Sequence, residues 1–120
     1  MSGRFHYLLQ DAVELHVHSY PSIFSRKQTD WELIEDAKKA KMSAIVLKSH
    51  ESQTVDRAAL IQEKESLINI FGGLVCNYFT GGLSPSVVET AIRLGAKVIE
   101  KPTLSSKKLQ HYFKNKKTIL

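Results

Sequence analysis

The sequence predicts an α/β fold built from four βα units. Short apolar runs alternate with segments of helical periodicity along its 120 residues. Because the connections are short, the repeated βα units imply parallel strands with right-handed crossovers. With 42% hydrophobic and 24% charged residues, the chain has room for one domain with one core. We expect a single domain over residues 1–120, with an N-terminal extension at 1–10 and a basic helix at 105–120.

The strands are predicted from apolar runs of different character. The first run alternates polar and apolar residues, whereas the second is apolar almost throughout, as expected when both faces of a strand are covered. Gly72-Gly73 interrupts the third run, which indicates a bulge or the start of a strand. The predicted strands lie at residues 12–18, 43–48, within 68–78, and 97–101.

Helix boundaries follow from capping residues. Thr29 and Glu32 match a capping box, Pro85 suits a first helical position after Ser84, and Gly95 suits a C-terminal stop. The predicted helices cover residues 29–41, 54–67, the segment from Pro85 to Gly95, and a last segment that begins at Ser105 or Ser106.

Composition excludes several classes of protein. No stretch approaches the roughly 20 apolar residues of a membrane helix, and residues 1–10 lack the pattern of a secretory signal. The single cysteine, Cys76, cannot form an internal disulfide, so we expect a cytoplasmic protein. Residues 105–120 hold five lysines and no acid. Such a tail can attract phosphate, but it is more often a solvated face, so nucleic acid is not the expected partner.

Polar residues follow the end of each predicted strand. His16-Val17-His18-Ser19 closes the first strand and Lys48-Ser49-His50 the second, while Asn77 and Glu100 follow in the third and fourth. Ligands bind at the carboxyl ends of strands in parallel α/β folds, so we expect these side chains to converge on one rim.

His16 and His18 are the candidate metal ligands. Residues two apart on a strand share a face, so both imidazoles should point the same way. Two neutral imidazoles can hold one divalent cation. The alternative is a pair of histidines that alternate by chance, but a Lys-Ser-His at the end of the next strand favours the metal site.

Lys48 and His50 are the candidate catalytic residues. His50 could be a third ligand or a general base, or a surface histidine. Lys48 could bind an anionic group or act as a base, or face solvent.

Ser19 and Asn77 are the candidate substrate-binding residues, and Asn77 could instead close a turn. Glu100 could complete a metal shell or form an ion pair with Lys101. The glycine-rich turn before Ser84 and Pro85 presents a helix N-terminus to the same rim, without a phosphate-loop signature.

A family resemblance lies in three segments: DAVELHVHSYPSIFSR, AIVLKSH, and GGLVCNYFTGGLSPSVVETAIRLGAKVIEKPT. Over about residues 10–105, the chain resembles the opening half of amidohydrolase-like, metal-dependent hydrolases of the TIM-barrel class. It is most similar to an uncharacterised group that usually has Asp where this chain has Glu14.

The resemblance implies a divalent metal ion, zinc or else manganese, iron or nickel, at His16 and His18. Lys48 and His50 match the KSH element of that group. The implied activity is the attack of metal-activated water on a C–N, C–O or phosphoester bond of a small molecule. The implied fold is half of a (β/α)8 barrel, whose exposed edges favour a homodimer. The alternative is a truncated, catalytically incomplete binding module.

Overall fold

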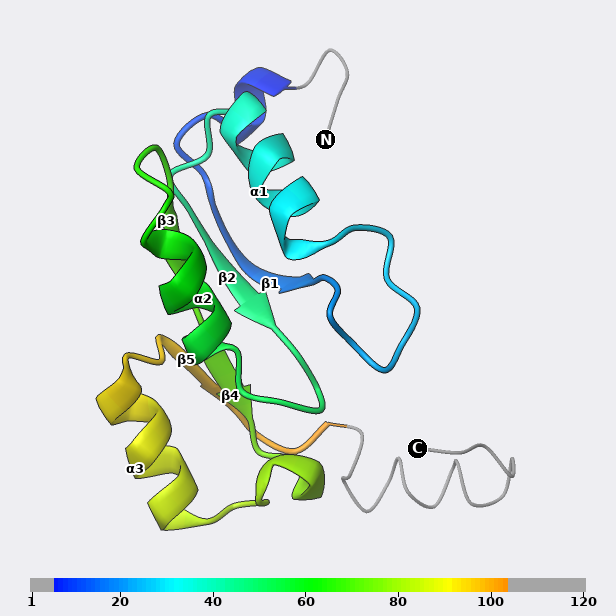
Figure 1. Ribbon diagram of the computed structural model, residues 1–120, viewed down its shortest axis with the longest axis vertical. Helices are drawn as coiled ribbons and strands as arrows, with labels where there is room; N and C mark the ends of the chain where they lie inside the picture. Colours follow the sequence, from blue (N-terminus) through cyan, green and yellow to red (C-terminus); the bar gives the residue numbers. More distant parts are fainter. Residues whose placement is uncertain (1–5, 104–120) are drawn as a thin grey trace.

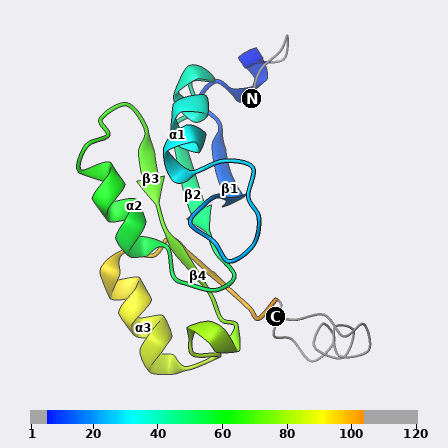
Figure 2. The same ribbon diagram turned by 45° about the vertical axis from the view of Figure 1, so that its right-hand side comes forward.

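The computed structural model describes residues 6–103 and shows helices and parallel strands in alternation (Figures 1 and 2). This order confirms the α/β class, and the predicted helix at 105–120 lies outside the described residues. The elements are η1 (His6–Leu9), β1 (Val13–His18), α1 (Asp30–Lys39), β2 (Ala44–Lys48), α2 (Val55–Gln62), β3 (Asn69–Phe71), β4 (Gly73–Val75), η2 (Tyr78–Thr80), α3 (Pro85–Leu94) and β5 (Val98–Glu100).

The strands form two small parallel sheets. One has the order β1-β2-β3, and the other consists of β4 and β5. β3 and β4 are consecutive pieces of the third predicted strand, separated at Gly72, so the predicted interruption is confirmed. The residues from 6 to 103 do not close into a barrel, and the half-barrel architecture stays a prediction.

The main core lies between β2 and the helices α1 and α2. Ile45 and Leu47 of β2 are almost fully buried and belong to one cluster with apolar residues of both helices. Side chains alternate along a strand, so Val46 and Lys48 face away from these helices. A smaller cluster, formed by Leu74, Cys76 and Ala91, holds α3 against β4. The polar end of β2 therefore projects from a strand that is packed along its whole length.

The helix ends follow local hydrogen bonding. The predicted capping box forms, because Thr29 accepts a hydrogen bond from the Glu32 amide while Glu32 accepts one from the Thr29 amide. Gly95 ends α3 with φ +108°. However, α2 ends at Gln62, earlier than the predicted Leu67. The Gln62 side chain bonds the carbonyl groups of Glu65 and Ile68, which turns the chain toward β3.

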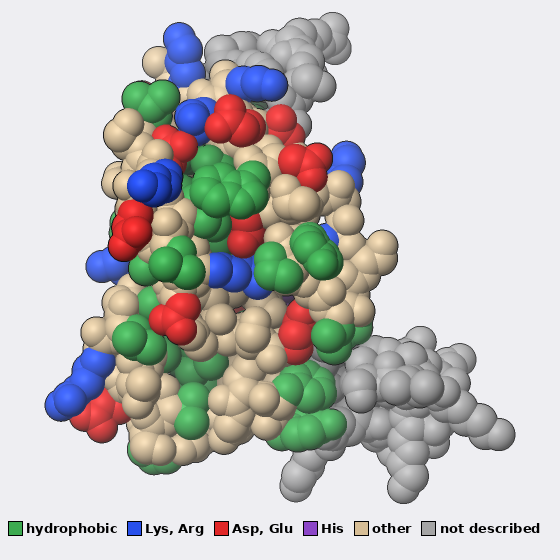
Figure 3. Space-filling view, viewed as in Figure 1, with side chains coloured by type: hydrophobic (Ala, Val, Ile, Leu, Met, Phe, Trp, Pro, Cys, Tyr) green, Lys and Arg blue, Asp and Glu red, His purple; other side chains and the backbone are tan. Residues whose placement is uncertain are grey.

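The surface is mixed in character. Charged and apolar side chains are interspersed over α1 and α2 on the face seen in Figure 3. Within residues 6–103, no helix combines the length and the apolar content that a bilayer crossing requires.

Candidate functional site

The ends of β1, β2 and β5 bring five polar side chains together. We call His16, His18, Lys48, His50 and Glu100 the strand-end cluster. β1 and β2 are parallel neighbours in one sheet, and β4 brings β5 of the second sheet to the same side of the molecule, so residues separated by up to 84 positions in the sequence can meet there. The convergence expected from the sequence is therefore present for these five residues.

The two histidines of β1 lie on the same side of the strand. Their ring centroids are 5.2 Å apart in an edge-to-face arrangement. The register of β1 against β2 shifts by one residue between Glu14 and Val17, which marks a β-bulge. The His16 amide, inside this bulge, donates to the Glu14 carboxylate over 2.9 Å. His16 is exposed and His18 half-buried, so both rings are accessible from solvent.

Lys48 is buried beneath His16 and bridges two strands. Its Nζ lies 2.6 Å from Glu100 Oε2 and 3.1 Å from His16 Nδ1. An ammonium group can only donate, so the His16 nitrogen must accept. Glu100 thus pairs with Lys48. The sequence had left open a different ion pair, with the neighbouring Lys101, or a place in a metal shell. The pairing depends on β4, which contacts both β2 and β5, and no local pattern encodes this arrangement.

His50 is oriented by a small hydrogen-bonded network. Its Nδ1 lies 2.8 Å from Thr103 Oγ1, so Nε2 is the ring nitrogen that remains for a ligand. Asn77, fully buried, donates to both Thr103 Oγ1 and the His50 carbonyl over 3.0 Å. The structure therefore places Asn77 beneath the rim as a support for His50, while its predicted contact with a substrate stays a prediction. Thr103 belongs to the segment Glu100-Lys101-Pro102-Thr103 that ends the fourth predicted strand, but the sequence pattern assigned it no role of its own.

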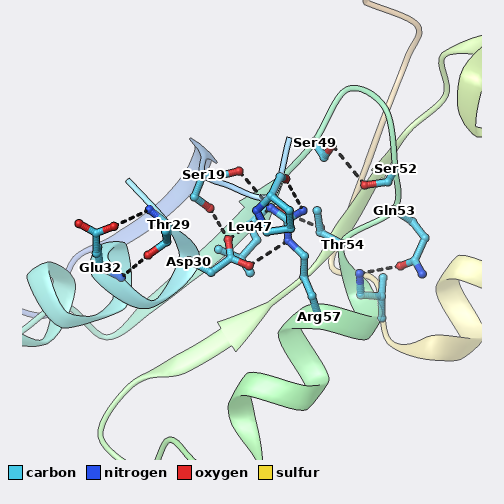
Figure 4. Close-up of polar contacts among 12 residues, drawn as sticks. Ser19, Thr29, Asp30, Glu32, Leu47, Ser49, Ser52, Gln53, Thr54 and Arg57 are labelled. Atoms are coloured by element: carbon cyan, nitrogen blue, oxygen red, sulfur yellow. Dashed lines mark hydrogen bonds and ion pairs between the residues drawn. The ribbon is translucent and has the colours of Figure 1, made fainter. Parts of the chain in front are cut away.

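Ser19 lies in a buried ionic cluster (Figure 4). Its hydroxyl donates to Asp30 Oδ1, and Arg57 Nε lies 3.1 Å from Asp30 Oδ2. Arg57 also donates to the Ser19 carbonyl over 3.3 Å. Ser19 is only 1% exposed, so in this structure it anchors the chain after β1. Its predicted role in substrate binding stays a prediction. Asp30 and Arg57 were missed because they lie 27 residues apart and no local motif joins them.

The loop between β1 and α1 is attached to the loop that precedes α2. Ser22 Oγ and the Ile23 amide both donate to Glu51 Oε1, over 2.7 and 3.0 Å. Hydrogen bonding of this kind holds the pKa of Glu51 below its ordinary value despite partial burial. The Glu51 carboxylate, next to His50 in the sequence, therefore holds the loop between β1 and α1 beside the strand-end cluster.

Burial favours the neutral form of two histidines of the cluster, His18 and His50. It lowers the pKa of His18 to about 4, and the nearby His50, Arg26 and Lys48 add to this effect. Burial and the Lys48 ammonium also lower the pKa of His50. Neutral imidazole is the form that binds metals. In addition, His18 Nδ1 is buried without a hydrogen-bond partner among the described residues.

We expect acid to destabilise the metal-free protein through His18. Between about pH 6.5 and about pH 4 the unfolded chain binds this proton more strongly, so the free energy of unfolding falls as the pH falls. The loss is on the order of 1 kcal/mol after allowance for solvent screening. Urea denaturation across this range, with His18→Gln as comparison, measures it. An equal pH slope in the variant would contradict the assignment.

Two side chains of the strand-end cluster, His16 and His18, have the spacing needed to bind one metal ion. Two imidazoles on a tetrahedral zinc ion, with Zn–N bonds of about 2.0–2.1 Å, have centroids about 5 Å apart. The 5.2 Å between His16 and His18 matches this spacing. His50 does not converge with them, because its ring stacks on His18 at 4.6 Å with planes 26° apart, and ring lone pairs lie in the ring plane. The described residues contain no group of three or more metal-binding side chains in suitable positions.

A cavity of about 400 Å³ lies elsewhere, between the loop before α2, η2 and α3. Apolar side chains such as Phe79, Val87 and Leu94 line much of it. Among residues 6–103, Glu51 is the one charged residue in its lining, and none of the strand-end cluster takes part. The chemistry of the described residues is therefore concentrated at the cluster and not in this cavity.

Comparisons with known proteins identify a family without a known activity. No curated protein and no solved structure matches this chain. The resemblance to amidohydrolase-like hydrolases stays a prediction. A family model matches residues 11–119, which is most of the chain. The chain therefore belongs to DUF6282, a family of unknown function.

Proposed function

We propose that this protein is a metal-dependent hydrolase that binds a divalent ion, zinc first, through His16 and His18. The proposal rests above all on His18 Nδ1, which is buried and has no hydrogen-bond partner among the described residues. The ring centroids of His18 and His16 are 5.2 Å apart. A buried polar atom without a hydrogen bond is costly, and a ligand would satisfy it. When bound, such an ion supplies a Lewis acid and lowers the pKa of water.

The other cluster residues have supporting roles in this proposal. His50 offers Nε2 as a general base, because Thr103 occupies its Nδ1. Lys48, whose charge Glu100 balances, orients His16 by donating to it. A catalytic zinc site uses three protein ligands, and a second copy of the chain is the proposed source of the third. Such a dimer would pair the outer strands β1 and β5 of two copies, as the predicted half-barrel requires.

Zinc titration by calorimetry tests the metal site. We expect one zinc ion per chain for the wild type and at least about tenfold weaker binding for His16→Ala and His18→Ala. His111→Ala, which replaces a histidine outside the described residues, is the matched control. Light scattering of the zinc-loaded protein measures the oligomeric state, and a monomer would contradict the completed site. Turnover of ester, amide and phosphoester substrates should disappear in His16→Ala.

A catalytically incomplete binding module is the second candidate. It is favoured by Lys48, whose Nζ lies 3.1 and 3.3 Å from the two ring nitrogens of His16 and so competes with a metal ion for that ring. In that case the wild type binds a small molecule at the cluster, with or without zinc, but hydrolyses none of the substrates. Zinc binding that is unaffected by both histidine substitutions would contradict the proposed hydrolase.

A further inference from the structure

Arg26, in the loop between β1 and α1, differs from the other described arginines. Arg57 forms an ion pair with Asp30, and Arg93 with Glu89. Arg26 has no carboxylate partner within residues 6–103. Its Nε donates to Ser22 Oγ over 3.3 Å, and the terminal nitrogens of its guanidinium have no acceptor in the described part of the chain. A half-buried guanidinium thus keeps most of its donors available.

The surrounding loop holds Arg26 beside the strand-end cluster. Its guanidinium carbon lies 5.4 Å from the centroid of the Phe24 ring, and this ring meets His50 edge-on at 6.3 Å. The Phe24 amide donates to Ser22 Oγ, and Ser22 in turn is bound to Glu51. The charge of Arg26 also helps to lower the pKa values of His18 and His50. The geometry therefore places Arg26 near these imidazoles, and the effect of its charge on their pKa values agrees with that position.

The chemistry of these groups selects an oxyanion. A guanidinium presents a planar set of donors that matches a carboxylate or a phosphate. The neighbouring charged groups do not take up the donors of Arg26. Glu100 neutralises Lys48, and the Glu51 carboxylate is linked to Arg26 only through the Ser22 hydroxyl. We infer that Arg26 binds the carboxylate or phosphate group of the small molecule that the strand-end cluster accepts. This names the substrate class and rests on the proposed function for the identity of the site.

Titration with inorganic phosphate and, separately, with acetate tests the inference. Metal-free protein is used at constant ionic strength with chloride as the reference. The Arg26 Nε–H signal and the ring C–H signals of His18 and His50 are followed by NMR. We expect a saturable shift with at least one of the two anions, and which anion saturates distinguishes a phosphate from a carboxylate site. Arg26→Gln should weaken this binding roughly tenfold, the usual effect of losing a charged hydrogen bond.

Matched variants control for charge and folding. Lys27→Gln removes the adjacent exposed charge and should leave phosphate and acetate binding unchanged. Arg26→Lys retains the positive charge but lacks the planar, forked set of guanidinium donors. It should bind the anion with intermediate strength, even if Arg26→Gln perturbs the loop. Shifts that match those of chloride, or equal binding by the wild type and Arg26→Gln, would overturn the inference.

Zinc binding separates this inference from the proposed function. Arg26→Gln should bind zinc as the wild type does, because Arg26 lies outside the donor set. Anion binding that depends on Arg26 in a protein that binds no zinc would refute the hydrolase and support the anion site. Zinc binding without saturable binding of either anion would support the hydrolase and refute the anion site.

Discussion

Replacing Gly72 with alanine is expected to destabilise the protein by about 3 kcal/mol or more. A Cβ at this position would lie 2.5 Å from the carbonyl carbon and oxygen of Thr54 and from Val55 Cα. All three are backbone atoms at the start of α2, so no side-chain rotation can relieve the clash. Thr54 is itself fixed, because its hydroxyl donates to the Leu47 carbonyl and accepts from the Gly73 amide.

Urea denaturation measures this loss, and Gly82→Ala is its matched control. Gly82 has a φ of +68° but no atom within 4 Å of a built Cβ. Its replacement should therefore cost only the backbone strain, about 1 kcal/mol. A free energy of unfolding for Gly72→Ala equal to that of Gly82→Ala would show that α2 does not press on the junction of β3 and β4.

Replacing Asp30 with alanine is expected to cost about 3–5 kcal/mol, because it strands a buried charge. The Arg57 side chain is 18% exposed and the Asp30 side chain 6% exposed, so water cannot fully replace the lost partner. Asp30 also accepts the Ser19 hydroxyl directly after β1. The variant should therefore also loosen the loop that carries Arg26 and weaken anion binding at the strand-end cluster.

Chemical denaturation tests this second expectation with two comparisons. Glu89→Ala breaks the exposed pair with Arg93 and should change the free energy of unfolding by no more than about 0.5 kcal/mol. The double variant with Asp30→Ala and Arg57→Met removes both charges and should regain much of the lost stability. A single variant as stable as the wild type would mean that the pair does not hold the loop.

The parts that were predicted correctly depend on neighbours in the sequence. The capping box of Thr29 and Glu32 spans one helical turn, and Gly95 ends α3 by its own backbone conformation. His16 and His18 share a side because adjacent residues of a strand alternate. The convergence of strand ends on one rim follows from parallel βα topology alone.

The contacts that position the side chains of the candidate site could not be predicted from such local patterns. The partner of Lys48 is Glu100, and the support of His50 comes from Asn77 and Thr103, which lie 27 and 53 positions away from it. The bulge in β1 also required the register against β2. These contacts depend on which strands lie beside one another and in what register.

By itself, the amino-acid sequence determined the α/β class, most element boundaries, and the histidine pair at the end of the first strand. Each of these follows from periodicity or from capping within a few residues. Only the tertiary structure decided the division into two sheets at Gly72, the early end of α2, the Asp30–Arg57 pair, and the position of Lys48 against His16. The reason is physical: these features depend on close approach and burial of groups distant in the chain, and no local pattern records them.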